Sequence, residues 1–384
     1  MKKLWKFGFI LSALLIQVAT IGSTSGNPNL LFFTFERSYG TNGVANTDFG
    51  DITDVFYNGT DLLITDLGNS RVEIYTPTMD YETSFGVNGS GPGQFYQPSS
   101  IVSWGNKIYV ADQGLERIQI FDSNGNYISQ FGSNGTGNGQ FRDLAGIATN
   151  GTNLLVADFS NSRIQIFDMN GVYKGQFGTY GFAAGQLWAP YDVTMNSTNI
   201  FVTDTGNQMV DIFDLAGNFV SQVGGLGKFG TNTFEYLDGI ALMNGYIIVD
   251  DWANDYFMVL DASLNYVTRF GHSGSDDGGF NVASEFTIMG NYVVIADSFN
   301  FRITFYQAHF EQIPVTVTDK QVQTQQVTQV QTQKITTTEY QTTTLQSNSG
   351  SSKGGFLPFI TPLMLLSSIM IAVIIKRKKS NVQN

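Results

Sequence analysis

The sequence has no cysteine and only two histidines, His272 and His309, in 384 residues. The absence of cysteine excludes a disulfide scaffold, a cysteine-ligated zinc site and a lipid anchor on an N-terminal cysteine. The shortage of histidine leaves few side chains for acid–base or metal chemistry near neutral pH. Charged residues are scarce too, at 14%, against about a quarter in typical soluble domains. With 42 glycines and 31 phenylalanines, this composition favours many short, buried, tightly turned strands.

The few charges are unevenly distributed along the chain. Seven of the 20 basic residues lie in residues 1–26 and 356–384, which contain none of the 32 acidic ones. Residues 27–355 therefore carry 13 basic against 32 acidic residues, a net charge of −19. Because a surface of that sign repels phosphate groups, we expect no nucleic-acid partner.

One segment is repeated along the sequence, and its clearest copy is ADFSNSRIQIFD, residues 157–168. The aspartate at its second position recurs at steps of 46, 46, 46, 47 and 46 residues. A constant period in this range is typical of repeat architectures. The six aspartates are Asp66, Asp112, Asp158, Asp204, Asp251 and Asp297.

A single repeat, read from residue 95, contains four runs of β-branched and aromatic residues separated by glycine, asparagine and aspartate. The runs are FYQPSSIVSW, KIYVAD, RIQIFD and YISQFG. Such runs favour short strands joined by tight turns. Six four-stranded units around an axis make a six-bladed β-propeller, so we predict an all-β fold of that kind over residues 27–313.

The position of a Phe-Gly pair predicts how the ring closes. The outermost strand of most units ends in this pair, as in Phe85-Gly86 and Phe131-Gly132, but the sixth unit lacks one. One period before Phe85 stands Tyr39-Gly40, at the end of LLFFTFERSYG. We therefore expect the N-terminal segment to supply the fourth strand of the last blade, which removes the open sheet edges.

The first 26 residues have the pattern of a secretory signal peptide. Lys2, Lys3 and Lys6 precede an apolar run over residues 7–16, and small residues follow. This order of basic, apolar and small residues is typical of a cleaved signal, with an uncleaved membrane anchor as the alternative.

The C-terminal end predicts attachment to a membrane. Residues 356–375 form a 20-residue apolar run, about the length that spans a bilayer as a helix. The basic tail 376–384 begins KRKK, which places that end in the cytoplasm. Residues 314–355 are rich in Thr, Gln and Ser and predict a stalk. We thus expect a single-pass protein of the cell membrane with an extracellular propeller.

The repeated unit resembles the NHL repeat, which has an aspartate, then Asn-x-Arg, then an Ile-x-Ile-Phe strand. Here these are Asp158, Asn161, Arg163 and IQIF, and the match covers residues 31–307. The resemblance implies a six-bladed propeller. It also implies protein- or RNA-binding platforms, as in the tripartite-motif ubiquitin ligases, or an enzyme, as in an amidating lyase. The ligases need a cysteine-rich RING, RNA binders use basic faces, and the lyases ligate metal with several histidines, so none of these functions transfers directly.

The repeated aspartates are predicted to be architectural. Asp66, Asp112, Asp158 and Asp297 each have an arginine five residues later, well placed to pair with them across a turn. One such pair per unit indicates a scaffold and not a site. The DSNGN segment at Asp122 resembles the opening of a calcium loop but lacks the later glutamate, so we read it as a hairpin turn.

A second set of carboxylates is a candidate metal site. At the entrances of the six innermost strands the equivalent positions hold three carboxylates, two glycines and a serine. Asp54, Asp192 and Glu285 around one funnel could hold a calcium ion together with water. This is the only cofactor that the sequence suggests, and it would fit a metal-dependent hydrolase or lyase of the lactonase-like propeller type. A solvated acidic mouth is the plainer alternative.

The copies differ most in the fourth and fifth units. Met209 and Tyr256 stand where arginine is expected, and nearby loops carry Tyr180 and Phe182. If these side chains project from the face that holds the loops between blades, they form an aromatic surface suited to a sugar or protein ligand. Packing between blades is the alternative. The predicted ligand-binding residues are Trp188, Asp192, Tyr236, Asp238, Asp251, Trp252, Asn254 and Tyr256.

Five N-glycosylation sequons predict surface positions. They begin at Asn58, Asn88, Asn134, Asn150 and Asn196. The function we expect is recognition of an extracellular protein or glycan by an anchored surface module. The hydrolase or lyase and a structural component of a surface layer are the alternatives.

Overall fold

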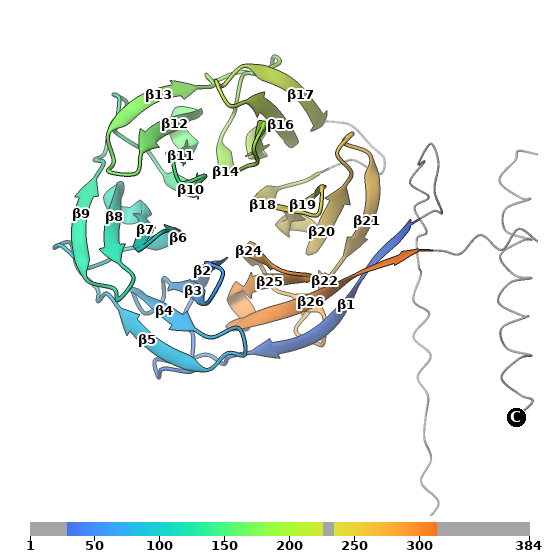
Figure 1. The fold of residues 1–384 in the computed structure, drawn as a ribbon, viewed down its shortest axis with the longest axis horizontal. Helices are drawn as coiled ribbons and strands as arrows, with labels where there is room; N and C mark the ends of the chain where they lie inside the picture. The colour runs from blue at the N-terminus through green and yellow to red at the C-terminus, as the bar shows by residue number, and fades with distance from the viewer. Residues whose placement is uncertain (1–28, 226–233, 313–384) are drawn as a thin grey trace, which may run out of the picture. The chain divides into compact units, whose positions relative to one another are not determined.

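The computed structural model describes residues 29–225 and 234–312, and in it the runs of each repeat form four-stranded antiparallel sheets. Six such sheets stand around a central axis, with the first strand of each unit innermost (Figure 1). The fold is a six-bladed β-propeller, as the sequence predicts. A short parallel pair, β22 (His272–Ser273) with β23 (Gly279–Phe280), lies between the last two blades in the sequence.

The blades are numbered in chain order. Blade 1 holds β2 (Ile52–Tyr57), β3 (Leu62–Asp66), β4 (Arg71–Tyr75) and β5 (Tyr81–Phe85). Blade 2 holds β6 (Pro98–Trp104), β7 (Lys107–Asp112), β8 (Arg117–Asp122) and β9 (Tyr127–Phe131). Blade 3 holds β10 (Leu144–Thr149), β11 (Asn153–Asp158), β12 (Arg163–Asp168) and β13 (Tyr173–Phe177).

Blade 4 holds β14 (Pro190–Met195), β15 (Asn199–Asp204), β16 (Met209–Asp214) and β17 (Phe219–Gly224). Blade 5 holds β18 (Leu237–Met243), β19 (Tyr246–Asp251), β20 (Tyr256–Leu260) and β21 (Tyr266–Phe270). Blade 6 holds β24 (Ala283–Met289), β25 (Tyr292–Asp297) and β26 (Arg302–Gln312). In blades 2 to 6 a 3₁₀ turn follows the repeated aspartate: η1 (Gln113–Leu115), η2 (Phe159–Asn161), η3 (Thr205–Asn207), η4 (Trp252–Asn254) and η5 (Ser298–Asn300).

The ring closes through β1 (Asn29–Tyr39), which is the outermost strand of blade 6. It pairs antiparallel with β26, bringing Leu31 opposite Phe310 and Phe35 opposite Tyr306. Figure 1 shows the blue N-terminal strand lying beside the orange strand from the end of the propeller. The predicted closure is therefore confirmed.

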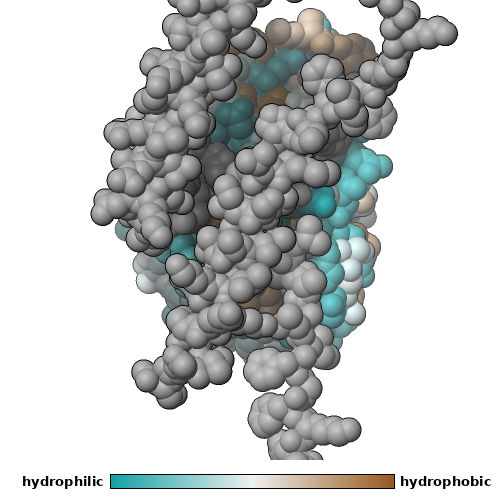
Figure 2. All heavy atoms as spheres, turned by 90° about the vertical axis from the view of Figure 1, so that its right-hand side faces the viewer, coloured by the Kyte–Doolittle hydropathy of each residue, from teal (hydrophilic) through white to brown (hydrophobic). Residues whose placement is uncertain are grey.

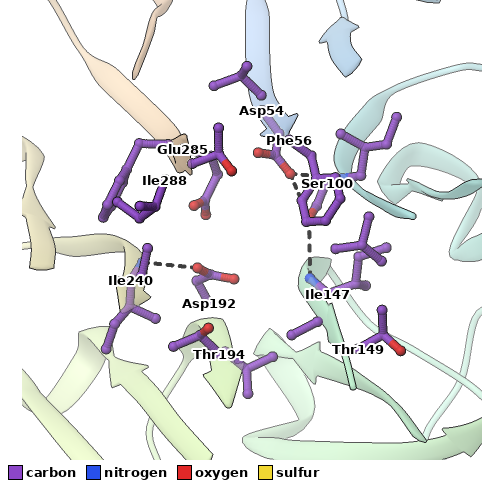
Figure 3. A pocket seen from close by; sticks show the side chains of 18 of the residues that line it. Asp54, Phe56, Ser100, Ile147, Thr149, Asp192, Thr194, Ile240, Glu285 and Ile288 are labelled. Atoms are coloured by element: carbon purple, nitrogen blue, oxygen red, sulfur yellow. Dashed lines mark hydrogen bonds between the residues drawn. The ribbon is translucent and has the colours of Figure 1, made fainter. Parts of the chain in front are cut away.

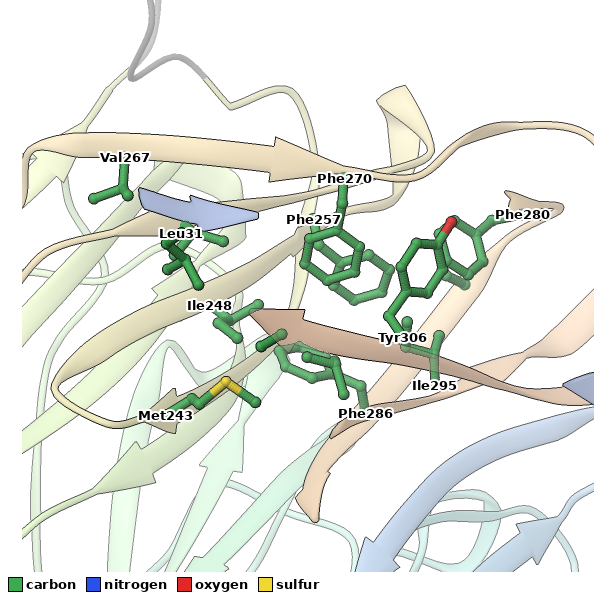
Figure 4. Packing of buried hydrophobic residues seen from close by; sticks show 14 residues of the cluster. Leu31, Met243, Ile248, Phe257, Val267, Phe270, Phe280, Phe286, Ile295 and Tyr306 are labelled. Atoms are coloured by element: carbon green, nitrogen blue, oxygen red, sulfur yellow. The ribbon is translucent and has the colours of Figure 1, made fainter. Parts of the chain in front are cut away.

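Aromatic side chains fill the space between neighbouring blades. Where blade 5 meets blade 6, Phe257, Phe270 and Tyr306 pack in sequence, with ring centroids 5.2 Å and 4.8 Å apart. Leu31 of the closing strand belongs to the same buried cluster (Figure 4). Burying a side chain of this size stabilises a fold by about 1.5–3 kcal/mol, so these contacts fix the blades against one another.

The glycine that follows the last aromatic residue of most outer strands has a steric cause. Gly86 has a φ of +94°, and a Cβ there would lie 2.4 Å from a ring carbon of Phe95. Phe95 is fully buried between blades 1 and 2. Glycine is needed because the chain must turn in the left-handed region and pass directly over this ring.

The repeated aspartates are structural, as predicted. The buried carboxylate of Asp158 accepts a hydrogen bond from Arg163 Nε at 2.7 Å and from the backbone N–H of Arg142 at 2.9 Å. It thereby joins the loop entering the blade to the β11–β12 turn. The other arginine-paired blades repeat this ion pair, in Asp66–Arg71, Asp112–Arg117 and Asp297–Arg302.

The outer strands have one packed face and one face in water. In β9 the residues alternate between half-buried and exposed, which is the pattern of a sheet covered on one side only. Hydrophilic residues accordingly occupy much of the rim that is visible in Figure 2.

The predicted signal peptide 1–26, stalk 314–355, membrane span 356–375 and tail 376–384 lie outside the described residues. Within the part of the chain that is described, no helix has the length and apolar character needed to cross a membrane.

Candidate functional site

A cavity of about 300 Å³ lies among the six inner strands, each of which contributes to its wall. Acidic residues, a serine, threonines and hydrophobic residues surround it (Figure 3). The acidic residues are Asp54, Asp192 and Glu285, and the serine is Ser100. The structure therefore brings together the three carboxylates that the repeat alignment selected.

All three carboxylates are almost completely buried, with exposures of 6–8%. Burial raises the pKa of Asp54 and of Asp192 to about 7. It also raises the pKa of Glu285 well above its usual value, and the charges of Asp192 and Asp54 add to this effect. The group is thus poised to hold protons near neutral pH and to act as a set of weak acids.

Two of these carboxylates connect neighbouring blades. Asp54 Oδ2 accepts hydrogen bonds from Ser100 Oγ at 3.0 Å and from the backbone N–H of Ile101 at 2.8 Å. Asp192 Oδ2 accepts one from the backbone N–H of Ile240 at 3.0 Å. Because an N–H group that faces the axis has no further strand to pair with, a side chain from the preceding blade satisfies it. These carboxylates therefore also stabilise the ring.

Ser100 plays the same role between blades 2 and 3, where its Oγ accepts a hydrogen bond from the backbone N–H of Ile147 at 3.2 Å. Glycine occupies the equivalent positions of blades 3 and 5 for a different reason. A Cβ on Gly146 would lie 2.1 Å from Asp192 Oδ1, and one on Gly239 would lie 2.6 Å from Glu285 Oε2. The glycines leave room for the acidic side chains of the next blade.

Two more buried acidic residues lie close to this group. Asp238 is 6% exposed and Asp250 is fully buried. Burial raises the pKa of each well above its usual value; the charge of Asp238 adds to the effect on Asp250, and both charges act on Glu285. The repeat alignment did not select Asp250, whose equivalents in the other five blades are small and uncharged, such as Ala111 and Thr203. The signal that could have found it is an acidic residue at a position that is otherwise alanine or threonine.

The acidic side chains around the cavity do not form a preassembled metal site. Among the described residues, no three histidine or acidic side chains are placed so that they could hold a metal ion together. Asp54 and Asp192 each already use one oxygen for a backbone N–H group. The predicted ligands thus share a cavity, and calcium binding there stays a prediction.

The raised pKa values predict that the protein loses stability as pH rises. In the folded state Asp54 and Asp192 have pKa values of about 7, whereas an unfolded aspartate titrates near 3.9. Their contribution is complete below about pH 4 and is lost as pH rises through about 7. We expect a melting temperature at least about 5 °C lower at pH 8 than at pH 5, measured by circular dichroism.

Asp192→Asn keeps the acceptor for the Ile240 N–H group and is expected to reduce this pH dependence. Asp122→Asn is the matched control, since Asp122 lies in an exposed turn and has a lowered pKa. A melting temperature that rises from pH 5 to pH 8 would contradict the assignment.

The aromatic residues predicted at the upper face, the face of the loops between blades, do reach the surface. Tyr180, Phe182 and Trp188 are 62%, 60% and 38% exposed. Their rings contact one another with centroids 5.5–6.4 Å apart. Tyr236 is 37% exposed and its ring lies 4.9 Å from that of Trp252. We call Tyr180, Phe182 and Trp188 the blade 4 aromatic cluster.

Several of the other residues predicted at this face are inside the protein. Asp192, Asp238 and Asp251 are buried, and Asp251 accepts the backbone N–H groups of Glu235 and Tyr236 as the other repeated aspartates do. Tyr256 is half-buried, and the guanidinium of Arg269 lies 4.8 Å above its ring. Asn254 is exposed. The surface part of the predicted site is therefore Trp188, Tyr236, Trp252 and Asn254.

The sequons and the hairpin turn lie where expected. All five sequon asparagines, Asn58, Asn88, Asn134, Asn150 and Asn196, are exposed, while their glycosylation stays a prediction. The DSNGN segment forms a turn in which Asp122 Oδ1 accepts the backbone N–H groups of Asn124 and Asn126.

Comparison with known proteins supports the fold. Residues 97–179 match a family model described as a 6-bladed beta-propeller (DUF5128). The chain is a six-bladed β-propeller. A Bacteroides thetaiotaomicron protein of unknown function is similar in structure, with a TM-score of 0.54, 14% identity and coverage of 73% of this chain and 76% of that one.

Two lyase structures resemble the propeller to a similar degree. Virginiamycin B lyase from Staphylococcus aureus has a TM-score of 0.50 and 10% identity, covering 73% of this chain and 99% of that one. A streptogramin B lyase has a TM-score of 0.52 and 10% identity, covering 73% and 98%. At these identities the propeller shares a fold with them and nothing more is implied. No curated protein sequence matches the chain.

Proposed function

We propose that this propeller is a cell-surface recognition module that binds an extracellular glycan through its upper face. The observation that carries the proposal is the blade 4 aromatic cluster. Many aromatic rings in the described residues are buried between blades, whereas these three lie together at the surface with exposures of 38–62%. A cluster of exposed aromatic rings beside polar groups supports stacking on sugar rings.

The polar groups needed to fix a sugar lie beside the second aromatic pair. Asn254 is exposed next to Trp252, and its amide both donates and accepts hydrogen bonds. The backbone of the same loops adds further donors and acceptors. Aromatic stacking combined with a few polar contacts gives both affinity and orientation.

The sequence supports the location of this module. The predicted signal peptide 1–26, stalk 314–355 and membrane span 356–375 together favour display outside the cell, with anchoring through a single-pass helix and the C-terminus in the cytoplasm. The acidic balance of residues 27–355 favours an uncharged or basic ligand over a nucleic acid.

The proposal is tested by binding to an array of neutral oligosaccharides, followed by calorimetry on the saccharide that binds best. Trp188→Ala and Trp252→Ala are each expected to weaken binding about tenfold, because each removes one stacking surface worth on the order of 1 kcal/mol. Trp104→Ala is the matched control. Trp104 is 55% exposed and ends β6, at the opposite end of the inner strand from Pro98 and the upper loops.

If Trp188→Ala and Trp252→Ala both bind the saccharide with full affinity, the proposed aromatic binding face is wrong. Capture of an extracellular protein with no saccharide binding would replace the glycan by a protein ligand at the same face.

The convergence of Asp54, Asp192 and Glu285 on one cavity favours a second candidate, a metal-dependent hydrolase or lyase. Carboxyl groups with pKa values near 7 are suited to general acid–base catalysis. Elemental analysis of the purified propeller separates the candidates. A bound divalent ion that Asp192→Asn removes, together with hydrolytic activity, would favour the enzyme.

A further inference from the structure

Four blades hold an internal cation in the same place. In blade 3 the guanidinium of Arg163 donates to the Asp158 carboxylate at 2.7 Å. It also donates to the backbone carbonyls of Gly137 and Gln140 at 2.8 Å and 3.0 Å and to Gln176 Oε1 at 2.7 Å. The cation is therefore surrounded by oxygen atoms of the β11–β12 turn, the outer strand and the loop that enters the blade.

The two carbonyls stand at constant positions, 26 and 23 residues before the arginine. The same contacts recur in the other three blades. They join Arg71 to Ala45 and Asp48, Arg117 to Gly91 and Gln94, and Arg302 to Asp276 and Gly279. The loop is thus built around a positive charge.

Blade 4 keeps this arrangement but lacks the arginine. Met209 lies opposite Asp204 in the strand register, as Arg163 lies opposite Asp158. The loop retains its conformation, since Gln186 N–H donates to the Ala183 carbonyl at 2.8 Å. The carbonyls that stand 26 and 23 residues before Met209 are those of Ala183 and Gln186. Methionine supplies neither a charge nor hydrogen-bond donors to them.

Blade 4 has one more acidic residue at this place than blades 2 and 3. Asp204 is joined by Asp211, which stands where those blades have Gln119 and Gln165. Both aspartates have 0% exposure. Neither oxygen of Asp211 has a hydrogen-bond donor among the described residues, and the buried Asn207 Oδ1 also lacks one. Among the described residues no cation faces these two buried carboxylates, and ionised carboxylates without a cation are costly in a protein interior.

Blades 1 and 5 show how such charge is balanced elsewhere. In blade 1, Asp66 and Glu73 form the same pair of carboxylates, and Arg71 lies between them in contact with both. In blade 5, where Tyr256 replaces the arginine, Arg269 of the outer strand lies over its ring at 4.8 Å. In blade 4 the outer-strand residue opposite Asp211 is the uncharged Gln222. No ion pair to Asp204 or Asp211 occurs in the described part of the chain.

We propose that blade 4 binds a calcium ion where the other blades hold an arginine guanidinium. The ligands are the carboxylates of Asp204 and Asp211, Asn207 Oδ1, and the backbone carbonyls of Ala183 and Gln186. An all-oxygen set with two carboxylates, two carbonyls and an amide is the ligand chemistry of Ca²⁺. The +2 charge of the ion balances the two carboxylates.

The ion joins the carboxylates of β15 and β16 to the loop that enters blade 4, as the guanidinium of Arg163 joins the corresponding segments of blade 3. The bound ion also fixes the loop that carries the blade 4 aromatic cluster, although the site does not depend on the proposed function.

The test is calorimetric titration of Ca²⁺ into the chelator-treated propeller at pH 7.5, together with thermal unfolding with and without the ion. We expect one ion bound with high occupancy and a melting temperature raised by calcium. Met209→Arg restores the internal cation and is expected to abolish both calcium binding and the calcium effect on melting. In chelator it should melt at or above the temperature of the unmodified protein.

Asp211→Gln copies blades 2 and 3 and is expected to weaken Ca²⁺ binding at least tenfold. Val220→Arg is the matched control, because it adds the same charge to blade 4 at a position that is 51% exposed; it should leave binding unchanged. Asp192→Asn tests whether the ion binds in the central cavity and not in blade 4; it should leave Ca²⁺ binding unchanged. The proposal fails if no Ca²⁺ binds at millimolar concentration, or if binding survives Met209→Arg and is lost in Asp192→Asn.

Discussion

A chain that begins at residue 40 is expected to be at least about 5 kcal/mol less stable than one that begins at residue 29 and to associate into oligomers. The difference is β1. Leu31 is 4% exposed, Phe33 stacks on Phe270 with centroids 4.2 Å apart, and the Arg37 guanidinium lies 4.2 Å from the Phe305 ring. Each buried apolar side chain contributes about 1.5–3 kcal/mol.

Loss of this strand also exposes the hydrogen-bonding edge of β26. That strand pairs with β1 along ten residues, so its free edge becomes a template for a second molecule. Urea unfolding measures the stability, and size-exclusion chromatography measures the association. A synthetic peptide of residues 29–39, added in excess, should restore the monomer. A monomeric chain from residue 40 that unfolds at the same urea concentration would contradict the role of β1 in closure.

Arg163→Met is expected to destabilise the propeller by about 3–5 kcal/mol. The change leaves the fully buried Asp158 carboxylate without its cation and removes the hydrogen bonds to the carbonyls of Gly137 and Gln140. A buried charge without a partner costs several kcal/mol, because neither water nor a counterion reaches it. Urea unfolding at pH 7 gives the free energy directly.

Arg142→Met is the control for this prediction. Arg142 is exposed and contacts Asp158 only through its backbone N–H, so its side chain should matter by no more than about 0.5 kcal/mol. Equal stability of the two variants would show that the internal cation is dispensable. Arg163→Met is not expected to create a calcium site, since Gln165 supplies no second carboxylate.

Much of the fold follows from local chemistry and could be predicted. The period of the aspartates predicts the number of blades, because each unit forms its own hydrogen-bonded sheet. The position of Tyr39-Gly40 relative to Phe85-Gly86 predicts the closing strand, because both glycines allow the same tight passage over a buried ring. The Asp–Arg pairs are five residues apart and meet across a single turn.

The candidate site could be predicted only in part. Aligning the repeats selects Asp54, Asp192 and Glu285 as equivalent positions on inner strands, and equivalent positions of a ring face the same axis. The alignment also places Asp251 with the scaffold aspartates, yet a surface role was predicted for it as well. Its complete burial decides between the two.

The sequence of the repeated segment determined the fold of a single blade, because most contacts within a blade join residues that are close in the chain. Only the tertiary structure decided which side chains meet between neighbouring blades. Asp54 reaches the N–H group of Ile101 in the next blade, and Gly146 is small because Asp192 needs its space. The same holds for the missing arginine of blade 4. The sequence shows Met209, but only the tertiary structure shows that Asp204, which lies opposite it, and Asp211 and Asn207 are all buried.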